Sequence, residues 1–271
     1  MQQTAEQLRS EGRVGFVPTM GALHQGHLEL VRRARAGADF VVVSIFVNPI
    51  QFGPGEDFAR YPRNFSRDYR LLRAAGVDVI FYPRARDMYL PDFSTYVEVE
   101  GLTRELCGRS RPGHFRGVTT VVAKLFNIVK PHFAVFGQKD AQQALVIKRM
   151  VRDLNFDLKV VVVPTVRERD GLAMSSRNVY LTPAQRGQAS VLYQALQLAV
   201  RLIRSGVTDA RRVQQALRRL ISQQPEARID YIQIVDTKRL QPVQKIEGEV
   251  LIGLAVYFGK ARLIDNIIIR R

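Results

Sequence analysis

The feature of this sequence that most constrains its fold is a predominantly apolar run, Asp39–Val47 (DFVVVSIFV), which is rich in β-branched residues. A strand of this kind is buried on both faces, which is typical of a parallel sheet covered by helices. A second apolar run, Arg13–Pro18 (RVGFVP), ends at a turn, and Leu28–Arg35 between the two runs has helical composition. The order strand, helix, strand predicts a βαβ unit.

The same alternation continues to about residue 165. Val118, Val121, Val122 and Leu125 recur at helical spacing, so a helix with one apolar face is expected before Pro131. The other expected elements are a helix at Ser66–Ala75, a helix ending near Arg152, and strands at Val77–Tyr82, His132–Gly137 and Leu158–Pro164. This pattern predicts an α/β fold with a Rossmann-like, doubly wound parallel sheet in residues 1–165, whose ligands bind beyond the carboxyl ends of the strands.

The pattern changes in the last part of the chain. Thr182-Pro183 predicts the start of one long helix that ends near Arg204, and Thr208 or Asp209 is expected to cap a second helix. Three strand-like runs follow, at Arg228–Val235, Val250–Phe258 and Arg262–Ile269. Helices followed by strands predict a smaller α+β domain, residues 166–271, which could serve as a lid.

Composition excludes several classes of protein. With 46% hydrophobic and 24% charged residues, the chain is not disordered overall. Its longest apolar stretches fall well short of the ~20 residues of a membrane helix, so no membrane partner is expected. The single cysteine, Cys107, cannot form an internal disulfide, and the polar N-terminus lacks the layout of a signal peptide. These features predict a cytoplasmic protein.

The net charge is strongly positive, with 41 Lys and Arg against 25 Asp and Glu, or +16. Such an excess is compatible with nucleic acid, an anionic membrane or a phosphorylated small molecule. The excess is spread over both halves, and many arginines lie on segments typical of solvated helix faces, such as Arg201, Arg204, Arg211, Arg212, Arg218 and Arg219. The charge alone favours an ordinary charged surface over a nucleic-acid footprint.

The first polar motif, PTMGALHQGH, places His24 and His27 three residues apart at a strand-to-helix turn. Unpaired backbone N–H groups and the helix dipole favour phosphate at such a turn. Imidazoles there can donate hydrogen bonds to phosphoryl oxygens during nucleotidyl transfer. Two alternatives remain at this stage: helix caps without a chemical role, and a metal pair that lacks a third ligand.

Two further motifs offer polar groups in loops. FVNPIQF contains Asn48 and Gln51, whose neutral amides can hold hydroxyls and carboxylates, although it can also be an ordinary Asn-Pro turn. RPGHFRG contains Arg111 and His114, which can either meet a phosphate or carboxylate or form a solvated connection.

The last two motifs carry cations. In FGQKDAQQ, Lys139 stands where a triphosphate could lie and Gln143 could reach a second substrate; alternatively Lys139 pairs with Asp140. In RERDGLAMSSRN, the segment Ser175–Arg177 follows a glycine and can form a mobile phosphate clamp, or else a polar linker. Its place at the domain boundary favours a closing lid.

The HxGH turn together with the late Met-Ser-Ser-Arg resembles the nucleotidyltransferase superfamily, with its HIGH- and KMSKS-type signatures. With all five motifs in this order, residues 14–185 resemble the pantoate–β-alanine ligases. The resemblance implies an enzyme that uses ATP and Mg²⁺ in pantothenate biosynthesis. The pantoate carboxylate attacks the α-phosphate, which gives pantoyl adenylate and pyrophosphate, and β-alanine then displaces AMP. The resemblance also implies a homodimer.

Roles for single residues are implied by the same resemblance. Gln51 and Gln143 would hydrogen-bond pantoate, with Asn48 nearby, and Arg111 and His114 would approach β-alanine or the phosphates. The catalytic and phosphate-holding group would be His24, His27, Lys139, Ser175, Ser176 and Arg177. The rest of the ATP pocket would be lined by Met20, Gly21, Gly137, Asp140, Val166 and Met174. Ligands of Mg²⁺ are not assigned.

Two rival functions are weighed against this one. An adenylyltransferase acting on a phosphorylated acceptor would need another cation where Gln51 and Gln143 stand. RNA binding is suggested by the charge and by the synthetase-like signatures. The dispersed charge and the shortness of the chain beyond the α/β domain argue against RNA, so no nucleic-acid partner is expected.

Overall fold

The computed structural model describes residues 1–271 and divides them into two compact units. The first unit consists of Met1–Glu100, Arg111–Gln138 and Gln143–Pro164. The second unit consists of Gly101–Ser110, Lys139–Gln142 and Thr165–Arg271. Two short internal segments therefore group with the C-terminal part of the chain.

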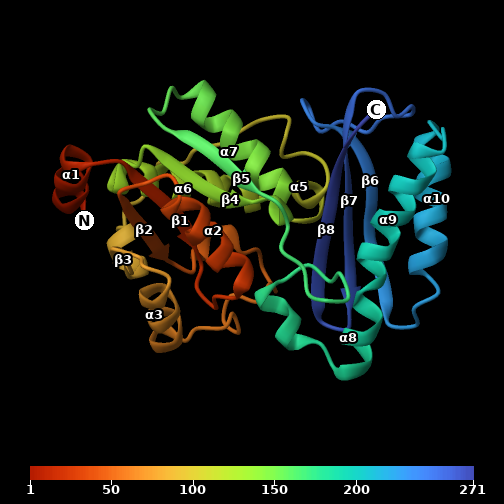
Figure 1. Ribbon diagram of the computed structural model, residues 1–271, viewed down its shortest axis with the longest axis horizontal. Helices are drawn as coiled ribbons and strands as arrows, with labels where there is room; N and C mark the ends of the chain where they lie inside the picture. Colours follow the sequence, from red (N-terminus) through yellow and green to blue (C-terminus); the bar gives the residue numbers. More distant parts are fainter. The chain divides into compact units, whose positions relative to one another are not determined.

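The first unit is built on a five-stranded parallel sheet with the strand order β3-β2-β1-β4-β5 (Figure 1). Its strands are β1 (Val14–Thr19), β2 (Phe40–Ile45), β3 (Val79–Phe81), β4 (Phe133–Gly137) and β5 (Lys159–Val163). The chain builds outward from β1 to β3 and then crosses to β4 and β5, so the order reverses between β1 and β4. The crevice at the carboxyl ends of two such strands is the usual ligand site of open α/β sheets. The predicted doubly wound sheet is confirmed.

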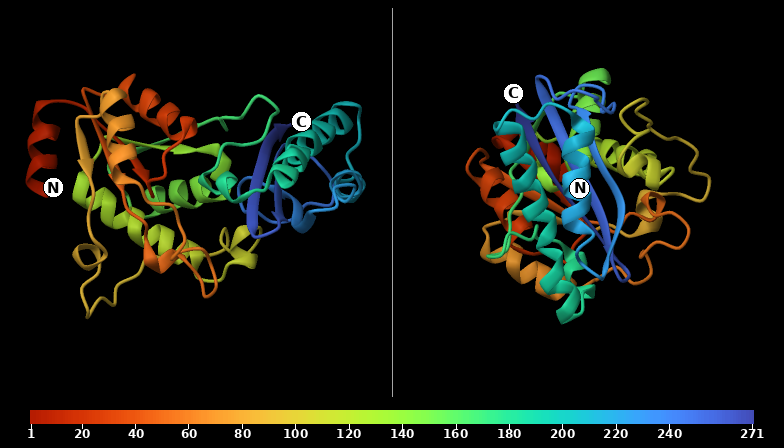
Figure 2. Two further views of the ribbon diagram at one scale, coloured as in Figure 1. Left: turned by 90° about the horizontal axis from the view of Figure 1, so that it is seen from below. Right: turned by 90° about the vertical axis from the view of Figure 1, so that its right-hand side faces the viewer.

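Helices cover both faces of this sheet. On one face, Val17 and Val43 belong to a buried cluster with Val31 of α2 and Leu72 of α3. On the other face, the Phe16 ring centroid lies 6.5 Å from that of Phe126 in α6. Figure 2 (left) shows α2 and α3, in orange, and α6, in yellow-green, on opposite sides of the strands. The helical segments of this part of the chain are α1 (Gln2–Glu11), α2 (Gln25–Arg35), η1 (Pro49–Gln51), α3 (Phe65–Ala74), α4 (Ala85–Met88), α6 (His114–Val129), η2 (Gln138–Asp140) and α7 (Ala141–Asp153).

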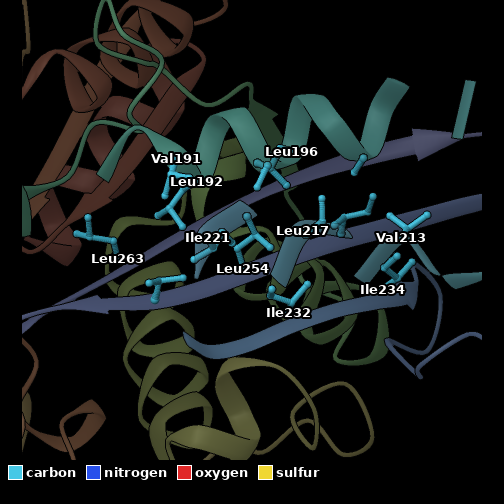
Figure 3. Close-up of a cluster of buried hydrophobic side chains, with 14 of the residues drawn as sticks. Val191, Leu192, Leu196, Val213, Leu217, Ile221, Ile232, Ile234, Leu254 and Leu263 are labelled. Atoms are coloured by element: carbon cyan, nitrogen blue, oxygen red, sulfur yellow. The ribbon is translucent and has the colours of Figure 1, made fainter. Parts of the chain in front are cut away.

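The second unit has a three-stranded antiparallel sheet in the order β6-β7-β8. Apolar side chains of two helices pack against it in one core (Figure 3). Val191 and Leu196 come from α9, Leu217 comes from α10, and Ile234 and Leu254 come from the sheet. The elements of this unit are α5 (Cys107–Ser110), η3 (Ser176–Tyr180), α8 (Pro183–Ala189), α9 (Val191–Arg204), α10 (Ala210–Ile221), β6 (Ala227–Asp236), β7 (Glu249–Phe258) and β8 (Ala261–Arg270). The predicted C-terminal α+β character is confirmed.

The prediction of a single helix from Thr182-Pro183 to Arg204 is wrong, because the structure has two helices that meet at Ser190. The Ser190 hydroxyl donates to the Gly187 carbonyl, and the Tyr193 N–H donates to the Ser190 carbonyl three residues back. Glycine is a weak helix former, and a serine hydroxyl competes for backbone groups, so the helical ladder is interrupted here.

The surface agrees with the interpretation of the charge. The arginines predicted to lie on solvated helix faces are all exposed on α9 and α10: Arg201, Arg204, Arg211, Arg212, Arg218 and Arg219. None of the helices combines the length and the apolar character that a membrane crossing requires.

A histidine ties together the first residues of three parallel strands. His132 Nδ1 accepts a hydrogen bond of 2.9 Å from the Val14 N–H, and its backbone N–H donates to the Val14 carbonyl. Its own carbonyl accepts from the Lys159 N–H. Burial lowers the pKa of His132, and the charges of Arg9 and Arg13 lower it further, so the ring accepts this bond in its neutral form.

The lowered pKa predicts that acid weakens the first unit. Below the ordinary histidine pKa of about 6.5, the unfolded chain binds a proton that the folded chain does not, so the free energy of unfolding falls as the pH drops towards the folded pKa. In His132→Asn, the amide oxygen can accept from Val14 without titrating. Urea unfolding at pH 7.5 and pH 5.5 should show a smaller acid-induced loss in this variant than in the parent. Equal losses in the two proteins would contradict this role.

Candidate active site

The two histidines of the HxGH motif form the N-terminus of α2, at the carboxyl end of β1. His24 is the N-cap, and its Nδ1 accepts from the Gly26 N–H at 3.1 Å. His27 Nδ1 accepts from the His24 N–H at 3.3 Å, and the two ring centroids lie 4.1 Å apart. Because Nδ1 of each ring accepts a hydrogen bond from a backbone N–H, the ring proton is assigned to Nε2. The pair therefore caps the helix and carries two Nε2–H donors at an anion-favouring helix terminus.

A buried carboxylate holds the turn that leads to these histidines. Asp68 of α3 is 1% exposed and accepts from the N–H groups of Ala22 and Leu23 at 2.8 and 2.9 Å. Gly21 has φ +79°, and a Cβ on it would lie 3.0 Å from the Asp68 Oδ2. A glycine is therefore needed for both the conformation and the close approach of the carboxylate. Nothing in the sequence pattern points to Asp68.

Gln51 has its side-chain amide oriented by a chain of neutral hydrogen bonds. The Tyr89 hydroxyl donates to Asn48 Oδ1 at 2.7 Å, and Asn48 Nδ2 donates to Gln51 Oε1 at 3.1 Å. Burial raises the pKa of the Tyr89 hydroxyl, which stays protonated as a donor. Since Gln51 Oε1 is engaged in this way, its Nε2 is directed to Met20 Sδ at 3.0 Å. Gln51 and Met20 are thus brought together, and Asn48 acts by positioning Gln51.

The backbone of Gln51 is fixed by the basic loop before α6. The ring of His114 contacts the Gln51 carbonyl through Nδ1 at 2.8 Å and Arg111 Nη1 through Nε2 at 3.0 Å. Arg111 is bound on its other side by both carboxylate oxygens of Glu56, each at 2.6 Å. Burial alone would raise the pKa of Glu56, but the hydrogen bonds and charge of Arg111 hold it below its ordinary value. Arg111 is therefore paired within the protein, and His114 positions Gln51.

Close packing between α6 and η1 depends on Gly117. A Cβ at this position would lie 2.3 Å from the Ile50 carbonyl oxygen and 2.6 Å from the Gln51 Cα. The Gly117 carbonyl also accepts from Asn48 Nδ2 at 3.0 Å. Glycine on an apolar helix face was the available sequence signal for this contact.

The motif FGQKDAQQ begins within β4, whose last two residues are Phe136 and Gly137. Lys139 lies in η2 and its Nζ is 3.5 Å from Asp140 Oδ2, so the pairing considered as an alternative is present. The Lys139 side chain is 20% exposed, while that of Asp140 is 47% exposed. Gln143 follows in the first turn of α7 and is half-buried.

The Met-Ser-Ser-Arg segment follows a tight turn in the second unit, which runs from Val166 to Met174 and contains an antiparallel bridge between Arg167 and Ala173. The Met174 N–H donates to the Val166 carbonyl at 3.0 Å, which closes the turn. Ser175 then caps η3, and its hydroxyl accepts from the Arg177 N–H at 3.3 Å. Ser176 is the first residue of η3. The segment is a half-buried cap that carries hydroxyl and guanidinium side chains.

The predicted site residues are distributed over the two units. The first unit holds Met20, Gly21, His24, His27, Asn48, Gln51, Gly137 and Gln143. The second unit holds Lys139, Asp140, Val166, Met174, Ser175, Ser176 and Arg177. No group of three or more His, Cys, Asp or Glu side chains is arranged to hold a metal ion.

A doubly wound sheet with histidines at the turn after β1 and a late Met-Ser-Ser-Arg segment defines an enzyme of the nucleotidyltransferase class. The family model described as pantoate-beta-alanine ligase matches residues 1–268. The chain belongs to this family.

Relatives and solved structures agree with this assignment. The chain is 58% identical over 270 residues to a pantothenate synthetase of Thermotoga neapolitana, which covers 99% of this chain and 96% of the relative. Its structure resembles that of pantothenate synthetase from Thermus thermophilus, with a TM-score of 0.92, 51% identity, and coverage of 97% and 96% of the two chains. A pantoate-beta-alanine ligase from Francisella tularensis, complexed with beta-gamma ATP and beta-alanine, has a TM-score of 0.79 and 36% identity, with coverage of 98% and 94%.

The position of Asp68 predicts a sharp effect of a very small change. Asp68→Asn keeps the shape but sets an amide N–H₂ against a backbone N–H, so one buried charge-assisted bond is lost. The free energy of unfolding should fall by about 1.5–3 kcal/mol in urea melts. Asp92→Asn, at an exposed carboxylate of the same unit, is the control and should change little. Equal midpoints for Asp68→Asn and the parent would show that the carboxylate does not hold the turn.

Proposed function

We propose that the motifs described above catalyse the reaction of the family, and that each motif binds or activates a different part of the substrates. The chain is an ATP-dependent, AMP-forming ligase that joins D-pantoate to β-alanine in pantothenate biosynthesis. The pantoate carboxylate displaces pyrophosphate from the α-phosphate of ATP to give pantoyl adenylate. The amine of β-alanine then attacks the acyl carbon and releases AMP.

The observation that carries the residue assignment is the position of His24 and His27 after β1, where Nδ1 of each ring accepts a backbone hydrogen bond and Nε2 is left as the donor. In the first step, two anions must approach each other, and negative charge accumulates on the phosphoryl oxygens. Preorganised donors at a helix terminus stabilise that charge without reorganising. The two histidines therefore act as hydrogen-bond donors to the reacting phosphate, and the chemistry proceeds without a covalent enzyme intermediate.

The pantoate pocket is assigned to Gln51 and Gln143. With Gln51 Oε1 engaged by Asn48, the Nε2–H₂ group is the part of the amide that can donate to a carboxylate or hydroxyl oxygen of the substrate. The nearby cation Arg111 is neutralised by Glu56. A neutral donor orients pantoate without holding its carboxylate so strongly that attack on phosphorus is suppressed, and it disfavours a phosphorylated acceptor.

The phosphates of ATP are assigned to a second set of donors. Lys139 supplies a compact positive charge for the β- and γ-phosphates and for the departing pyrophosphate. Ser175, Ser176 and Arg177 add hydroxyl and guanidinium donors of the kind that bind phosphoryl oxygens. Met20, Gly21, Gly137, Asp140, Val166 and Met174 are assigned to the remainder of the nucleotide pocket.

Magnesium is assigned to the nucleotide and not to a resident metal cage. The chain offers no cluster of three metal-ligating side chains. Mg²⁺ commonly keeps several waters and binds through substrate phosphates with one or two carboxylates, which suits a metal that enters with ATP. It would neutralise phosphate charge there. The residues named above bind and orient the nucleotide that carries it.

We assign the protein to the cytoplasm and expect a homodimer. Support for self-association comes from an exposed aromatic cluster beside the edge strand β3, where Phe65 and Tyr82 are 39% and 55% exposed and stack at 4.4 Å. A flat apolar cluster next to a sheet edge is suited to burial against a second copy. Sedimentation velocity of the purified chain measures this state.

Isotope exchange tests the order of the reaction. With pantoate present and β-alanine absent, labelled pyrophosphate should be incorporated into ATP, because adenylate formation is reversible. Omitting pantoate should abolish the exchange. Exchange that is indifferent to pantoate, or that requires a phosphorylated acid, would overturn the assignment. Tight binding of a mixed RNA pool at physiological salt would favour the RNA-binding alternative instead.

Replacement of one lysine tests the phosphate assignment. Lys139→Ala should reduce pyrophosphate exchange by about 100-fold or more, since a positioned cation stabilises the transition state. Lys148→Ala, at an exposed lysine of α7, is the matched control and should keep its activity. Circular dichroism should be unchanged in both. Activity of Lys139→Ala within a few-fold of the parent would exclude this lysine as a phosphate ligand.

A further inference from the structure

We propose that two adjacent residues of β8, Asp265 and Asn266, are positioning residues that hold the two phosphate-binding segments of the second unit. Asp265 fixes the turn that leads to Met174–Arg177, and Asn266 fixes the backbone of Lys139. This inference rests on the proposed function for its consequence in ATP binding, while the contacts themselves stand independently of it.

The two side chains leave β8 on opposite faces, as neighbours in a strand must. Leu263 and Ile267, two residues to either side of Asp265, belong to the core that faces α9 and α10. Asp265 therefore lies on the helix-covered face of the sheet. Both polar residues are buried, at 2% exposed for Asp265 and 6% for Asn266.

Asp265 forms a two-pronged ion pair with Arg167. The distances are 2.6 Å from Arg167 Nη1 to Asp265 Oδ2 and 2.9 Å from Nη2 to Oδ1, and Oδ1 also accepts from the Asn266 N–H. A buried carboxylate is costly unless it is paired in this way, so the arginine is held in one geometry.

Arg167 in turn holds the turn from Val166 to Met174. Its Nη1 donates to the Gly171 carbonyl at 3.0 Å, and its guanidinium lies 4.4 Å from the Tyr193 ring centroid. A Cβ on Gly171 would come within 2.0 Å of the Tyr193 ring, which shows how closely the turn packs on α9. Arg167 and Ala173 pair across the turn, one residue before Met174. Through Arg167, Asp265 therefore fixes the position of the start of the Met-Ser-Ser-Arg segment.

Asn266 acts on the other face of the strand. Its Nδ2 donates to the Lys139 carbonyl at 2.8 Å. Three residues along, Gln142 accepts from the Cys107 N–H at 2.9 Å and donates to the Leu102 carbonyl at 2.9 Å. The four-residue segment that bears Lys139 is therefore bound at both ends within the second unit, where it is grouped.

The spacing between Lys139 and Ser175–Arg177 is thus set by a single dipeptide. The two proposed phosphate-binding segments lie about 35 residues apart in the chain, and consecutive residues of one strand hold them in place. Sites held on strands are more precise than sites held by loops alone. Because a small misplacement of charged groups costs transition-state stabilisation, these two residues influence ATP without contacting it.

Hydrogen exchange read by mass spectrometry separates the two roles without using activity. Asp265→Asn should speed exchange in peptides covering residues 167–178 by about tenfold and leave residues 137–143 unchanged. Asn266→Ala should give the opposite pattern. Ile252→Val trims a buried side chain of the neighbouring strand β7 and is the control for a general loss of stability. Equal loosening of both segments in either variant, or no loosening, would overturn the proposal.

Kinetics supply the second readout. In both β8 variants the KM for ATP in pyrophosphate exchange should rise about tenfold or more, while the KM for pantoate stays within twofold. Matching rises in both constants, or no rise, would overturn the positioning role. If the parent protein fails to catalyse pantoate-dependent pyrophosphate exchange, the proposed function is wrong. The hydrogen-exchange pattern of the two variants then still decides whether β8 holds the two segments.

Discussion

The parallel pairing of β1 with β4 is the constraint on which the candidate site residues of the first unit depend. These strands are neighbours although more than 100 residues separate them, and Phe16 stands opposite Ala134 in their register. Their pairing places the carboxyl end of β1, with its histidine turn, beside the end of β4 at Gly137. The residues of β1, β2 and β4 are almost all buried, so a slip by one residue would disrupt their packing and displace both motifs.

Near the carboxyl ends of these strands, the groups proposed to bind ligands are oriented by contacts that a sequence motif does not reveal. The Gln51 amide is directed by Asn48 and Tyr89, and the turn before His24 is held by Asp68. Each arrangement satisfies a buried polar group while fixing the orientation of a neighbour. The motif residues therefore owe their geometry to partners from distant segments.

This explains how far the sequence could predict the structure. Continuous apolar runs such as Asp39–Val47 and the cap at Thr182 are local signals, and they predicted strands, helices and fold class correctly. The break at Ser190 was missed because good helix formers on both sides outweighed one glycine and one serine.

The candidate site was predictable only where residue type and local spacing carry the chemistry. The spacing of His24 and His27 suffices to place them on one helical turn, and the structure confirms it. Asp68 pairs with backbone N–H groups 45 and 46 residues away, and Asp265 pairs with a side chain 98 residues away. Contacts between residues so far apart in the chain depend on the completed fold. The hydrophobic periodicities of strands and helices, 2 and 3.6 residues, do not predict them.

Part of the large positive charge is accounted for by arginines that form ion pairs inside the protein. Of the 41 basic residues, 33 are arginine and 8 are lysine. Arg167 is paired with Asp265, Arg111 with Glu56, and Arg262 with Asp230, each through short contacts of 2.6–2.7 Å in partly or fully buried surroundings. The planar guanidinium suits such two-pronged pairing, whereas the ammonium of lysine is a compact, strongly hydrated charge.

Arginine thus supplies much of the internal scaffolding of this chain, beyond its solvated helix faces. The one lysine among the site motifs, Lys139, has only a longer contact of 3.5 Å with the half-exposed Asp140. An ammonium group held this loosely by the protein can pair with phosphate at little cost. A buried arginine would first have to break its ion pair with a carboxylate. The difference in pairing, more than the total charge, distinguishes Lys139, which is assigned to ATP, from the paired arginines that support the fold.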